Sequence, residues 1–309
     1  MSSIVAPAPP DAPFRAGHAA IAGRPNVGKS TLVNAWLGEH LSIVSPKPQT
    51  TRERIFGICT RPRGQVVFVD TPGLVQSPRH GLHRAMLLEA EEAITDADVV
   101  LYVCAADDAE THPDAASVAT FGARAGTVLL VVNKSDLLTP GERDALRARL
   151  QGQGLEVWLV SATEGEGLEA LLDRTLAALP PSPLLYPPLD LATQPVRFFA
   201  EEYVRETCLE LFEDEVPHGV ACRVEEFRED GDPVYIRMSL FVERPSQKAI
   251  VVGAGGEAVR RLGTRSRAKI EALIERPVYL DLWVKVLRGW RRHRGRLRYL
   301  GFRAPSPNP

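Results

Sequence analysis

The stretch GRPNVGKST, residues 23–31, decides the fold of the first half of the chain. Its spacing fits G-x-x-x-x-G-K-[ST], in which glycines let backbone N–H groups curl around phosphate oxygens. The motif has this meaning between a buried strand and a helix N-terminus, and the flanking runs HAAIA and LVNAWLG predict both. A chance glycine-rich turn is the alternative. The predicted phosphate contacts are Gly23, Asn26, Val27, Gly28, Lys29, Ser30 and Thr31.

Length and composition fit a soluble globular protein of two domains. The chain has 309 residues, of which 44% are hydrophobic and 25% charged. No apolar run approaches the roughly 20 residues of a membrane span, and the Pro/Ala-rich start, residues 1–16, predicts a disordered tail rather than a secretory signal. The four cysteines lack metal-ligand spacing, so we expect a reduced, cytoplasmic chain in which Cys104 is a core residue.

Residues 17–180 alternate strand-like and helix-like segments, which is typical of a doubly wound α/β domain. The strands around TRPRG are joined too closely for a crossover, so one antiparallel hairpin is expected in a mostly parallel sheet. The expected strands are 18–22, 54–60, 65–70, 99–105, 128–133 and 157–160, and the expected helices are 30–37, 80–94, 114–124, 140–151 and 167–179. The proline-rich stretch 181–190 predicts a semi-rigid linker to a second domain, 191–303, which a tail, 304–309, follows.

Three further motifs follow predicted strands, at the sheet edge where α/β folds hold ligands. In FVDTPG, Asp70 can face Mg²⁺ and the Gly73 N–H can face the terminal phosphate. In NKSD, the Asp136 carboxylate can accept two N–H bonds, which matches the guanine edge and not adenine. In SAT, a backbone N–H can reach the guanine carbonyl. With the phosphate loop, these motifs predict GTP as the ligand. The other predicted base contacts are Asn133, Lys134, Ser161, Ala162 and Thr163.

The four motifs together resemble the translation-factor-like branch of small GTPases over about residues 17–180. The resemblance implies that Lys29 contacts the β- and γ-phosphates and that Ser30 ligates Mg²⁺ beside Asp70. It also implies two switch segments that the γ-phosphate and the metal order. These are QTTRER, residues 49–54, with Thr51 as the second Mg²⁺ ligand and Thr50 in reserve, and residues 74–83.

One departure from the GTPase pattern bears on hydrolysis. Where other GTPases use a glutamine to orient the attacking water, this chain has Leu74 after Gly73, and leucine cannot do so. Hydrolysis should therefore be slow or helped from elsewhere. GTPases with a similar loop can use the asparagine that matches Asn26 to hold a potassium ion; the alternative for Asn26 is loop geometry, because asparagine tolerates the left-handed conformation. The predicted catalytic set is Lys29, Asn26, Thr51 and Gly73.

The second domain carries a G-x-x-G loop, GAGG, at residues 253–256. The expected order is helix (196–212), strand (219–227), strand (234–242), short helix, loop, short helix and strand (277–286). This order resembles an α+β type II KH domain, whose loop clamps the backbone of four single-stranded nucleotides. Glycines are expected there because phosphates approach too closely for side chains. The predicted RNA contacts are Gly253, Ala254, Gly255, Gly256, Arg260, Arg261, Arg291 and Arg292.

Charge is divided unevenly along the second domain. Residues 201–232 contain 12 acidic and 3 basic side chains, whereas residues 244–303 contain 16 basic and 4 acidic ones. This asymmetry predicts one face for a polyanion, with Trp283 and Trp290 among the basic residues available for base stacking. The alternative is a solvated charged face with Trp283 in the core.

The two domains together resemble the Era family of ribosome-assembly GTPases over about residues 17–303, through VERPSQKAIVVGAGG and VYLDLWVKVLRGWR. The resemblance implies a GTP-hydrolysing switch that binds near the 3′ end of small-subunit rRNA, and it leaves room for peripheral contact with the cytoplasmic membrane face. One departure is Ala254-Gly255, where the family commonly has basic residues. Two alternatives stay open: a GTP-gated RNA scaffold with incidental hydrolysis, and a tRNA-modification GTPase, although the folate or cysteine apparatus of the latter is not found. The sequence identifies no protein partner.

Overall fold

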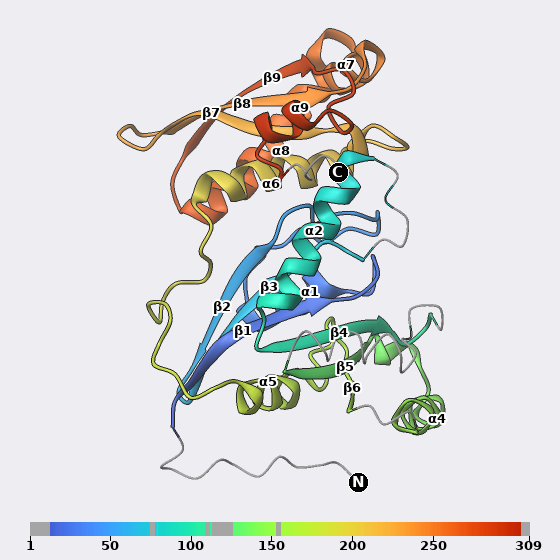
Figure 1. Ribbon diagram of the computed structural model, residues 1–309. Coiled ribbons are helices and arrows are strands. Elements are labelled where there is room, and N and C mark those ends of the chain that lie inside the picture. Colours follow the sequence, from blue (N-terminus) through green and yellow to red (C-terminus); the bar gives the residue numbers. More distant parts are fainter. Residues whose placement is uncertain are drawn as a thin grey trace. The chain divides into compact units, whose positions relative to one another are not determined.

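The computed structural model describes residues 13–74, 78, 80–108, 112, 126–152 and 156–303. It divides into a first unit, residues 1–44, 51–76 and 86–193, and a second unit, residues 45–50, 77–85 and 194–309 (Figure 1). Residues 1–12, the expected helix 114–124 and the tail 304–309 lie outside the described residues. The predicted disordered tail, residues 1–16, includes two residues that belong to the sheet, because Arg15 and Ala16 pair with Gly64 and Gln65.

The first unit is a six-stranded sheet with the strand order β2-β3-β1-β4-β5-β6. Its neighbouring strands run parallel except β2 and β3, which are antiparallel and confirm the expected hairpin. Two residues between these strands are too few for a crossover connection. The strands are β1 (Arg15–Ala22), β2 (Ile55–Arg61), β3 (Gly64–Asp70), β4 (Val99–Ala105), β5 (Thr127–Asn133) and β6 (Val157–Leu159).

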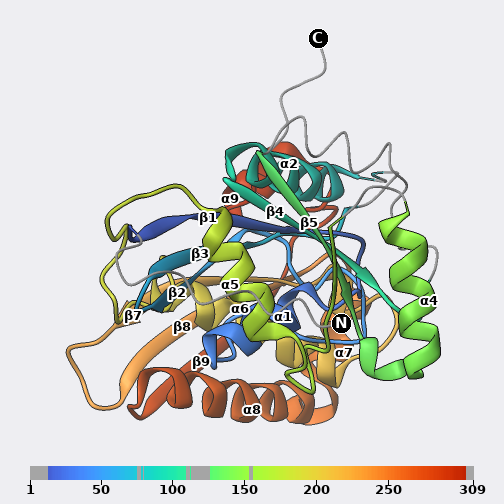
Figure 2. The same cartoon turned by 90° about the horizontal axis from the view of Figure 1, so that it is seen from below.

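Helices cover both faces of this sheet. Leucines of α1 (Lys29–Leu37) and α5 (Leu168–Ala178) belong to one buried cluster, and residues of α2 (Gly81–Asp96) and α4 (Pro140–Gln151) belong to the other. Figure 2 shows α2 on one side of the sheet and α1 and α5 on the other. The central strands are therefore buried on both faces, and their carboxyl ends gather the functional loops at one edge.

The cysteines and the helices of the described residues bear on two expectations from the sequence. The four cysteines, Cys59, Cys104, Cys208 and Cys222, are buried and free, and Cys104 is fully buried in β4, which confirms its core role. Within the described part of the chain, no helix combines the length and the apolar character needed to cross a membrane.

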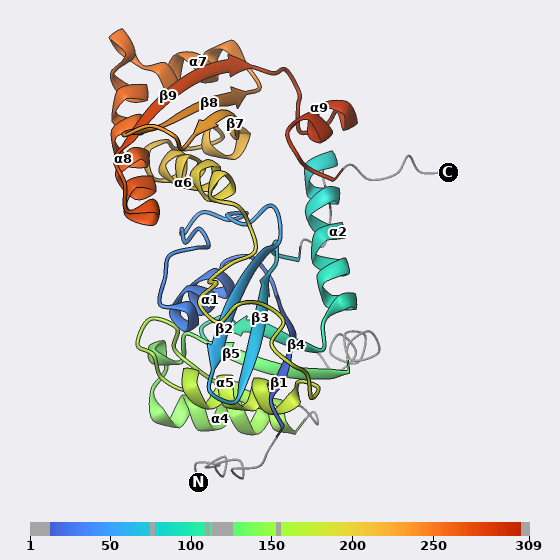
Figure 3. The same cartoon turned by 90° about the vertical axis from the view of Figure 1, so that its left-hand side faces the viewer.

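The second unit is a three-stranded sheet, β7-β8-β9, with β8 antiparallel to β7 and parallel to β9 (Figure 3). The element order confirms the expected KH pattern, but α8 has 18 residues and is not short. Its length follows from Leu262, Ser266 and Ile270, which recur every four residues and are buried along one face. The elements are α6 (Val196–Leu211), β7 (Ala221–Arg228), β8 (Val234–Val242), α7 (Pro245–Val252), α8 (Glu257–Ile274), β9 (Val278–Val286) and α9 (Arg294–Tyr299).

Two expectations about the tryptophans are wrong: Trp290 is not available for base stacking, and Trp283 is not in the core. Base stacking by the exposed Trp283 stays a prediction. Trp290 is 0% exposed, donates its indole N–H to the Gly219 carbonyl at 3.0 Å and stacks on Phe302, so it belongs to the core and cannot stack on a base. Trp283 is 57% exposed and is not a core residue. Side chains alternate along a strand, and Trp283 falls on the solvent face of β9, as does Tyr279.

Candidate nucleotide site and RNA-binding loop

The predicted phosphate loop turns sharply between β1 and α1. Gly23, Asn26 and Gly28 have positive φ angles of 145°, 65° and 91°, and Gly28 is the N-cap of α1. A Cβ atom on Gly28 would lie 2.2 Å from the side-chain nitrogen of Asn133, so this position has no room for a side chain. The unpaired N–H groups at the start of α1 follow directly, which is the arrangement that binds phosphate at helix N-termini.

Lys29 reaches back across this loop. Its Nζ donates to the carbonyls of Gly23 at 3.3 Å and Arg24 at 3.0 Å. Burial lowers the pKa of Lys29 to about 8, while the nearby Asp70 carboxylate opposes that shift. A buried ammonium group held by two carbonyls is prepared to donate to an anionic phosphate.

The three predicted metal ligands meet at one carboxylate. The hydroxyls of Ser30 and Thr51 donate to Asp70 Oδ2 at 2.8 and 3.3 Å, and these hydroxyls lie 3.2 Å apart. Asp70 is fully buried, and burial raises its pKa although Lys29 lowers it. Among the described residues, its Oδ1 atom has no hydrogen-bond partner. A buried, unpaired carboxylate oxygen beside two hydroxyls fits the oxygen ligands that Mg²⁺ prefers.

The segment after Asp70 packs tightly on the phosphate loop. The Leu74 N–H donates to the Gly23 carbonyl at 3.0 Å. A Cβ atom on Gly73 would lie 2.8 Å from the backbone nitrogen of Pro25, so glycine is required by this close approach. The structure therefore brings Gly73 to the phosphate loop. Residues 75–77 and 79 of the predicted second switch lie outside the described residues.

Asn133 joins the three loops that surround the predicted base site. Its amide nitrogen donates to the Val27 carbonyl at 2.9 Å, and its amide oxygen accepts from the Ala162 N–H at 3.0 Å. The side chain is thus engaged with backbone and positions the loops. Sequence reasoning placed Asn133 at the site but missed this role, because its partners are 106 and 29 residues away.

The other residues predicted to contact the base differ in exposure. Asp136 is exposed on a short 3₁₀ helix, Ser135–Leu137, so its carboxylate is accessible to a ligand. Lys134 has a positive φ of 62° and lies 3.6 Å from Asp107. Ser161 is buried, and its hydroxyl lies 3.2 Å from that of Thr163. Among these residues, Asp136 and Thr163 are exposed, Lys134 is partly buried, and Ser161 is buried.

Residues 45–50, which lead into Thr51, contact α6 within the second unit. Lys47 Nζ donates to the carbonyls of Leu209 at 2.7 Å and Phe212 at 2.6 Å, at the end of α6 where a positive charge is favourable. Arg205 of α6 donates to the Thr50 carbonyl. These bonds hold the backbone beside the predicted first switch, and nothing in the local sequence indicated them.

The G-x-x-G loop ends α7 and begins α8. Gly253, Gly255 and Gly256 all have positive φ angles, of 72°, 56° and 81°. A Cβ atom on Gly253 would lie 2.7 Å from that of Ala258, whereas Gly255 faces open space. Arg260 donates to the Gly255 carbonyl at 2.8 Å, so a guanidinium group reaches the loop although Ala254 and Gly255 carry no charge.

Part of the charge asymmetry is neutralised inside the second unit. Lys269 lies 2.6 Å from Glu206 of α6, and Arg237 lies 2.9 Å from Glu226 across β7 and β8. Arg291 pairs with Glu243, while Arg261 and Arg292 are exposed. The predicted RNA contacts therefore comprise one arginine bonded to the loop, one held by a carboxylate and two at the surface.

Both halves of the chain match family models. The model described as 50S ribosome-binding GTPase matches residues 18–134, and that of the KH domain matches residues 215–291. GTPase Era of Carboxydothermus hydrogenoformans is 39% identical over 293 residues, which cover 94% of this chain and 98% of that protein. GTPase Era of Geobacter metallireducens is 39% identical over 299 residues, which cover 94% and 99%. The chain belongs to the Era family of GTPases.

Solved Era structures share the fold over both units. A variant of Aquifex aeolicus Era bound to GDP·AlF4⁻ gives a TM-score of 0.87 at 33% identity, over 93% of this chain and 99% of that one. An Era in complex with MgGDPNP and nucleotides 1506–1542 of 16S ribosomal RNA gives 0.86 at 33% identity, with the same coverage. As an Era-family member with this fold, the chain is an enzyme that hydrolyses GTP to GDP and phosphate.

Proposed function

We propose that this Era-family GTPase is a switch that binds near the 3′ end of small-subunit ribosomal RNA during subunit assembly. The observation that carries the proposal is the combination, in one chain, of the Ser30–Thr51–Asp70 cluster with an exposed G-x-x-G loop. The relative solved with MgGDPNP and nucleotides 1506–1542 of 16S ribosomal RNA supports both ligands. Such work belongs in the cytoplasm, and peripheral membrane contact stays a prediction.

In this proposal, Ser30, Thr51 and Asp70 hold Mg²⁺, which when bound neutralises charge on the phosphate oxygens. Lys29 moves its hydrogen bonds from the loop carbonyls to the β- and γ-phosphates, and the Gly73 N–H faces the γ-phosphate. The phosphates are then stabilised by groups that are already in place, which lowers the cost of reorganisation.

At the other end of the nucleotide, the Asp136 carboxylate accepts the guanine N–H groups. Of the backbone N–H groups in residues 161–163, those of Ser161 and Ala162 are bonded to the Glu166 carbonyl and the Asn133 amide oxygen, so the Thr163 N–H is the one left for the guanine carbonyl. Lys134 lies along the base. Asn133 contributes by keeping these loops and the phosphate loop at fixed spacing. Guanine is then selected because adenine offers no matching donor pair.

Hydrolysis needs a group other than Leu74 to assist the attacking water. We propose that Asn26, exposed in the phosphate loop, helps to hold a potassium ion near the phosphates. Turnover should then be faster in potassium than in sodium at equal ionic strength, and Asn26→Gly, which keeps the left-handed backbone available, should remove the difference. Equal rates in the two salts would contradict the potassium proposal.

The RNA half of the proposal is tested on the loop. Ala254→Asp with Gly255→Asp places two carboxylates where phosphates approach, so we expect loss of specific RNA binding with GTP binding intact. The matched control is Ala145→Asp with Ala148→Asp, which adds the same charge to an exposed face of α4. Tight, sequence-selective RNA binding by the loop variant would mean that residues 253–256 are an ordinary turn.

A GTP-gated scaffold is the second candidate, and Leu74 favours it because slow hydrolysis suits a long-lived complex. The two candidates differ in how RNA is released. A switch releases RNA faster with GTP than with a non-hydrolysable analogue, because hydrolysis ends the binding state. Equal release rates would make hydrolysis incidental and favour the scaffold.

A further inference from the structure

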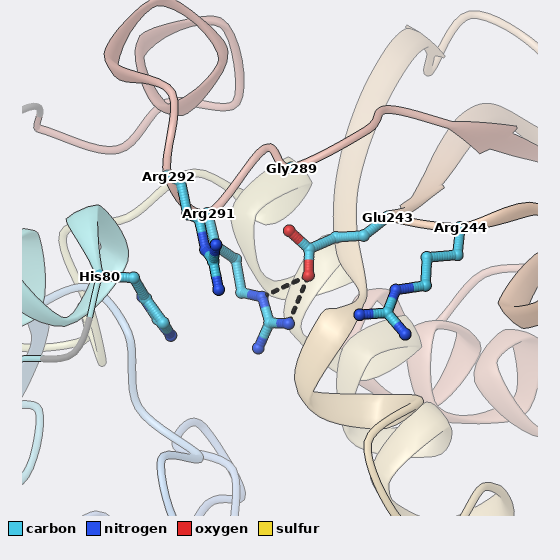
Figure 4. A pocket seen from close by; sticks show the side chains of 6 residues that line it. All are labelled: His80, Glu243, Arg244, Gly289, Arg291 and Arg292. Carbon is cyan, nitrogen blue, oxygen red and sulfur yellow. Dashed lines mark hydrogen bonds and ion pairs between the residues drawn. The ribbon is translucent and has the colours of Figure 1, made fainter.

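A small basic pocket lies in the second unit, at the edge where the parallel strands β8 and β9 end. It has a volume of about 210 Å³ and is lined by His80, Glu243, Arg244, Gly289, Arg291 and Arg292 (Figure 4). The N–H of Leu287, just beyond β9, donates to the carbonyl of Val242 at the end of β8, at 2.8 Å, so the two walls are joined. The volume is below the roughly 300 Å³ at which pockets for drug-sized ligands begin. It suits a single small group.

The charge of the pocket favours an anion. Arg291 donates through Nε to Glu243 Oε2 at 2.8 Å and through Nη2 to the same oxygen, which fixes the guanidinium and leaves Nη1 outside the ion pair. In the described ranges, no ion pair joins Arg244 or Arg292 to a carboxylate. Three arginines and one glutamate give a net charge of +2. Arginine clusters of this kind bind phosphate through charge-assisted hydrogen bonds.

His80 adds an uncharged donor to this wall. The His83 N–H donates to His80 Nδ1 at 3.4 Å, so the ring proton is assigned to Nε2. Burial, and then the neighbouring His83 and Arg291, lower the pKa of His80 to about 4, so the ring is neutral at neutral pH. Figure 4 shows the ring directed toward the Arg291 guanidinium.

Gly81 allows the start of α2 to lie against this wall. The Leu82 N–H donates to the Arg291 carbonyl at 3.0 Å. A Cβ atom on Gly81 would lie 3.0 Å from both that carbonyl oxygen and Leu297 Cδ1. His80 therefore completes the pocket only while residues 80–82 keep this position, and these residues belong to the predicted second switch.

The pocket and the G-x-x-G loop lie at opposite ends of one helix. Arg244 immediately precedes α7 and Gly253 follows it. Eight helical residues span about 12 Å, so a strand clamped by the loop needs only a short extension to reach the pocket.

We propose that this pocket binds one backbone phosphate of the RNA strand that the G-x-x-G loop clamps, outside the four nucleotides held there. The inference rests on the proposed RNA-binding function and adds to it a second, separate phosphate contact. Because His80 is one wall, RNA affinity would depend on the conformation of residues 80–82, which joins RNA binding to the second switch.

The test combines protein and RNA changes in one thermodynamic cycle. The probe is RNA of nucleotides 1506–1542 of 16S ribosomal RNA, and a series of copies each carries one neutral methylphosphonate linkage. Against the full-length protein, Arg244→Gln and Arg292→Gln should each weaken the unmodified RNA about fivefold and lower the salt slope by about 1. One methylphosphonate position should weaken binding to the wild type but not to the Arg244→Gln protein.

The controls separate this proposal from the function on which it rests. Arg147→Gln removes the same charge from the exposed face of α4 and should leave RNA affinity unchanged, and Arg244→Lys should restore part of it. Equal losses at every methylphosphonate position in wild type and Arg244→Gln would overturn the pocket proposal. Binding of inorganic pyrophosphate that depends on Arg244, without any coupled RNA position, would assign the pocket to a free anion and also overturn it. If the loop variant loses sequence-selective RNA binding while Arg244→Gln and Arg292→Gln bind RNA like the wild type, the pocket proposal is overturned and the proposed RNA-binding function is retained.

Discussion

The phosphate loop of the first unit and the G-x-x-G loop of the second use the same local device. Each places a glycine in the left-handed conformation as the N-cap of a helix, Gly28 at φ 91° and ψ 26° before α1, and Gly256 at φ 81° and ψ 15° before α8. Both leave helix N–H groups available to phosphate.

The two loops differ in how the rest of the protein supports them. The phosphate loop is tied by Asn133 and Leu74, which come from two other parts of the site, and by Lys29 at the start of α1. Around the G-x-x-G loop, within the described part of the chain, a side-chain hydrogen bond comes from Arg260 alone, and Gly255 faces open space. Support by many segments fixes the geometry that catalysis needs, while an exposed loop can adapt to an RNA backbone.

Gly28→Ala should have the largest effect and tests the tight side of this comparison. Its Cβ would lie 2.2 Å from the Asn133 amide nitrogen, so the loop and the Asn133 contacts cannot both persist. We expect GTP affinity to fall by at least roughly 100-fold. Gly38→Ala is the control, because Gly38 has φ 71° but nothing within 4 Å of its Cβ position. GTP affinities are measured by titration. Similar affinities in the two variants would show that the contact with Asn133 does not decide GTP binding.

Asp136→Asn tests whether the exposed end of the site selects the base. The substitution replaces one acceptor oxygen by an NH2 donor, so the two guanine N–H groups no longer meet two acceptor oxygens. GTP affinity should fall on the order of 100-fold while xanthosine triphosphate binding improves. Competition of the two nucleotides for wild type and variant measures this change. Asp144→Asn, on the exposed face of α4, is the control. If the Asp136 variant bound GTP as tightly as the wild type, the assignment of NKSD to the base site would be wrong.

The buried Lys29 should make nucleotide binding sensitive to alkaline pH. Its pKa is about 8 in the nucleotide-free protein and the phosphates raise it, so GTP affinity should fall up to about tenfold per pH unit above 8. Without nucleotide, Lys29 is protonated in the unfolded chain but largely deprotonated in the folded chain between pH 8 and pH 10.5. The free energy of unfolding therefore decreases as the pH falls through this range. Below pH 8, Lys29 is protonated in both states and causes no further change. Titrations of Lys29→Arg, which stays charged, separate this effect from ionisation of guanine. The same slope in that variant would contradict the assignment.

Gly255→Ala should have the smallest effect and tests the open side of the comparison. The added Cβ meets no neighbouring atom, so only the left-handed backbone at φ 56° is disfavoured, by about 1 kcal/mol. RNA affinity should fall about fivefold. Gly253→Ala, whose Cβ would lie 2.7 Å from that of Ala258, should weaken binding more. If Gly255→Ala reduced RNA affinity as much as Gly28→Ala reduces GTP affinity, the two loops would not differ in their tolerance of a side chain.

The sequence by itself predicted the motifs, the antiparallel pairing of the hairpin and most of the order of elements in both domains. Each of these follows from local chemistry: glycines where φ is positive, an aspartate that ends a buried strand, and a two-residue link that permits only antiparallel pairing. The sequence did not indicate α9, and the expected helix 114–124 lies outside the described residues. The family resemblance, and not local chemistry, placed Thr51 before Thr50, and Thr51 is the threonine that lies beside Ser30 and Asp70.

Tertiary structure decided which side chains meet. Asn133 bonds two distant loops, Lys47 reaches the end of α6, and Trp290 is buried while Trp283 is exposed. The basic pocket joins segments that are more than 150 residues apart, which no local pattern can indicate. Periodicity states which face of a strand or helix is apolar, but a side chain's partners depend on how the elements pack, and that is set by the whole chain.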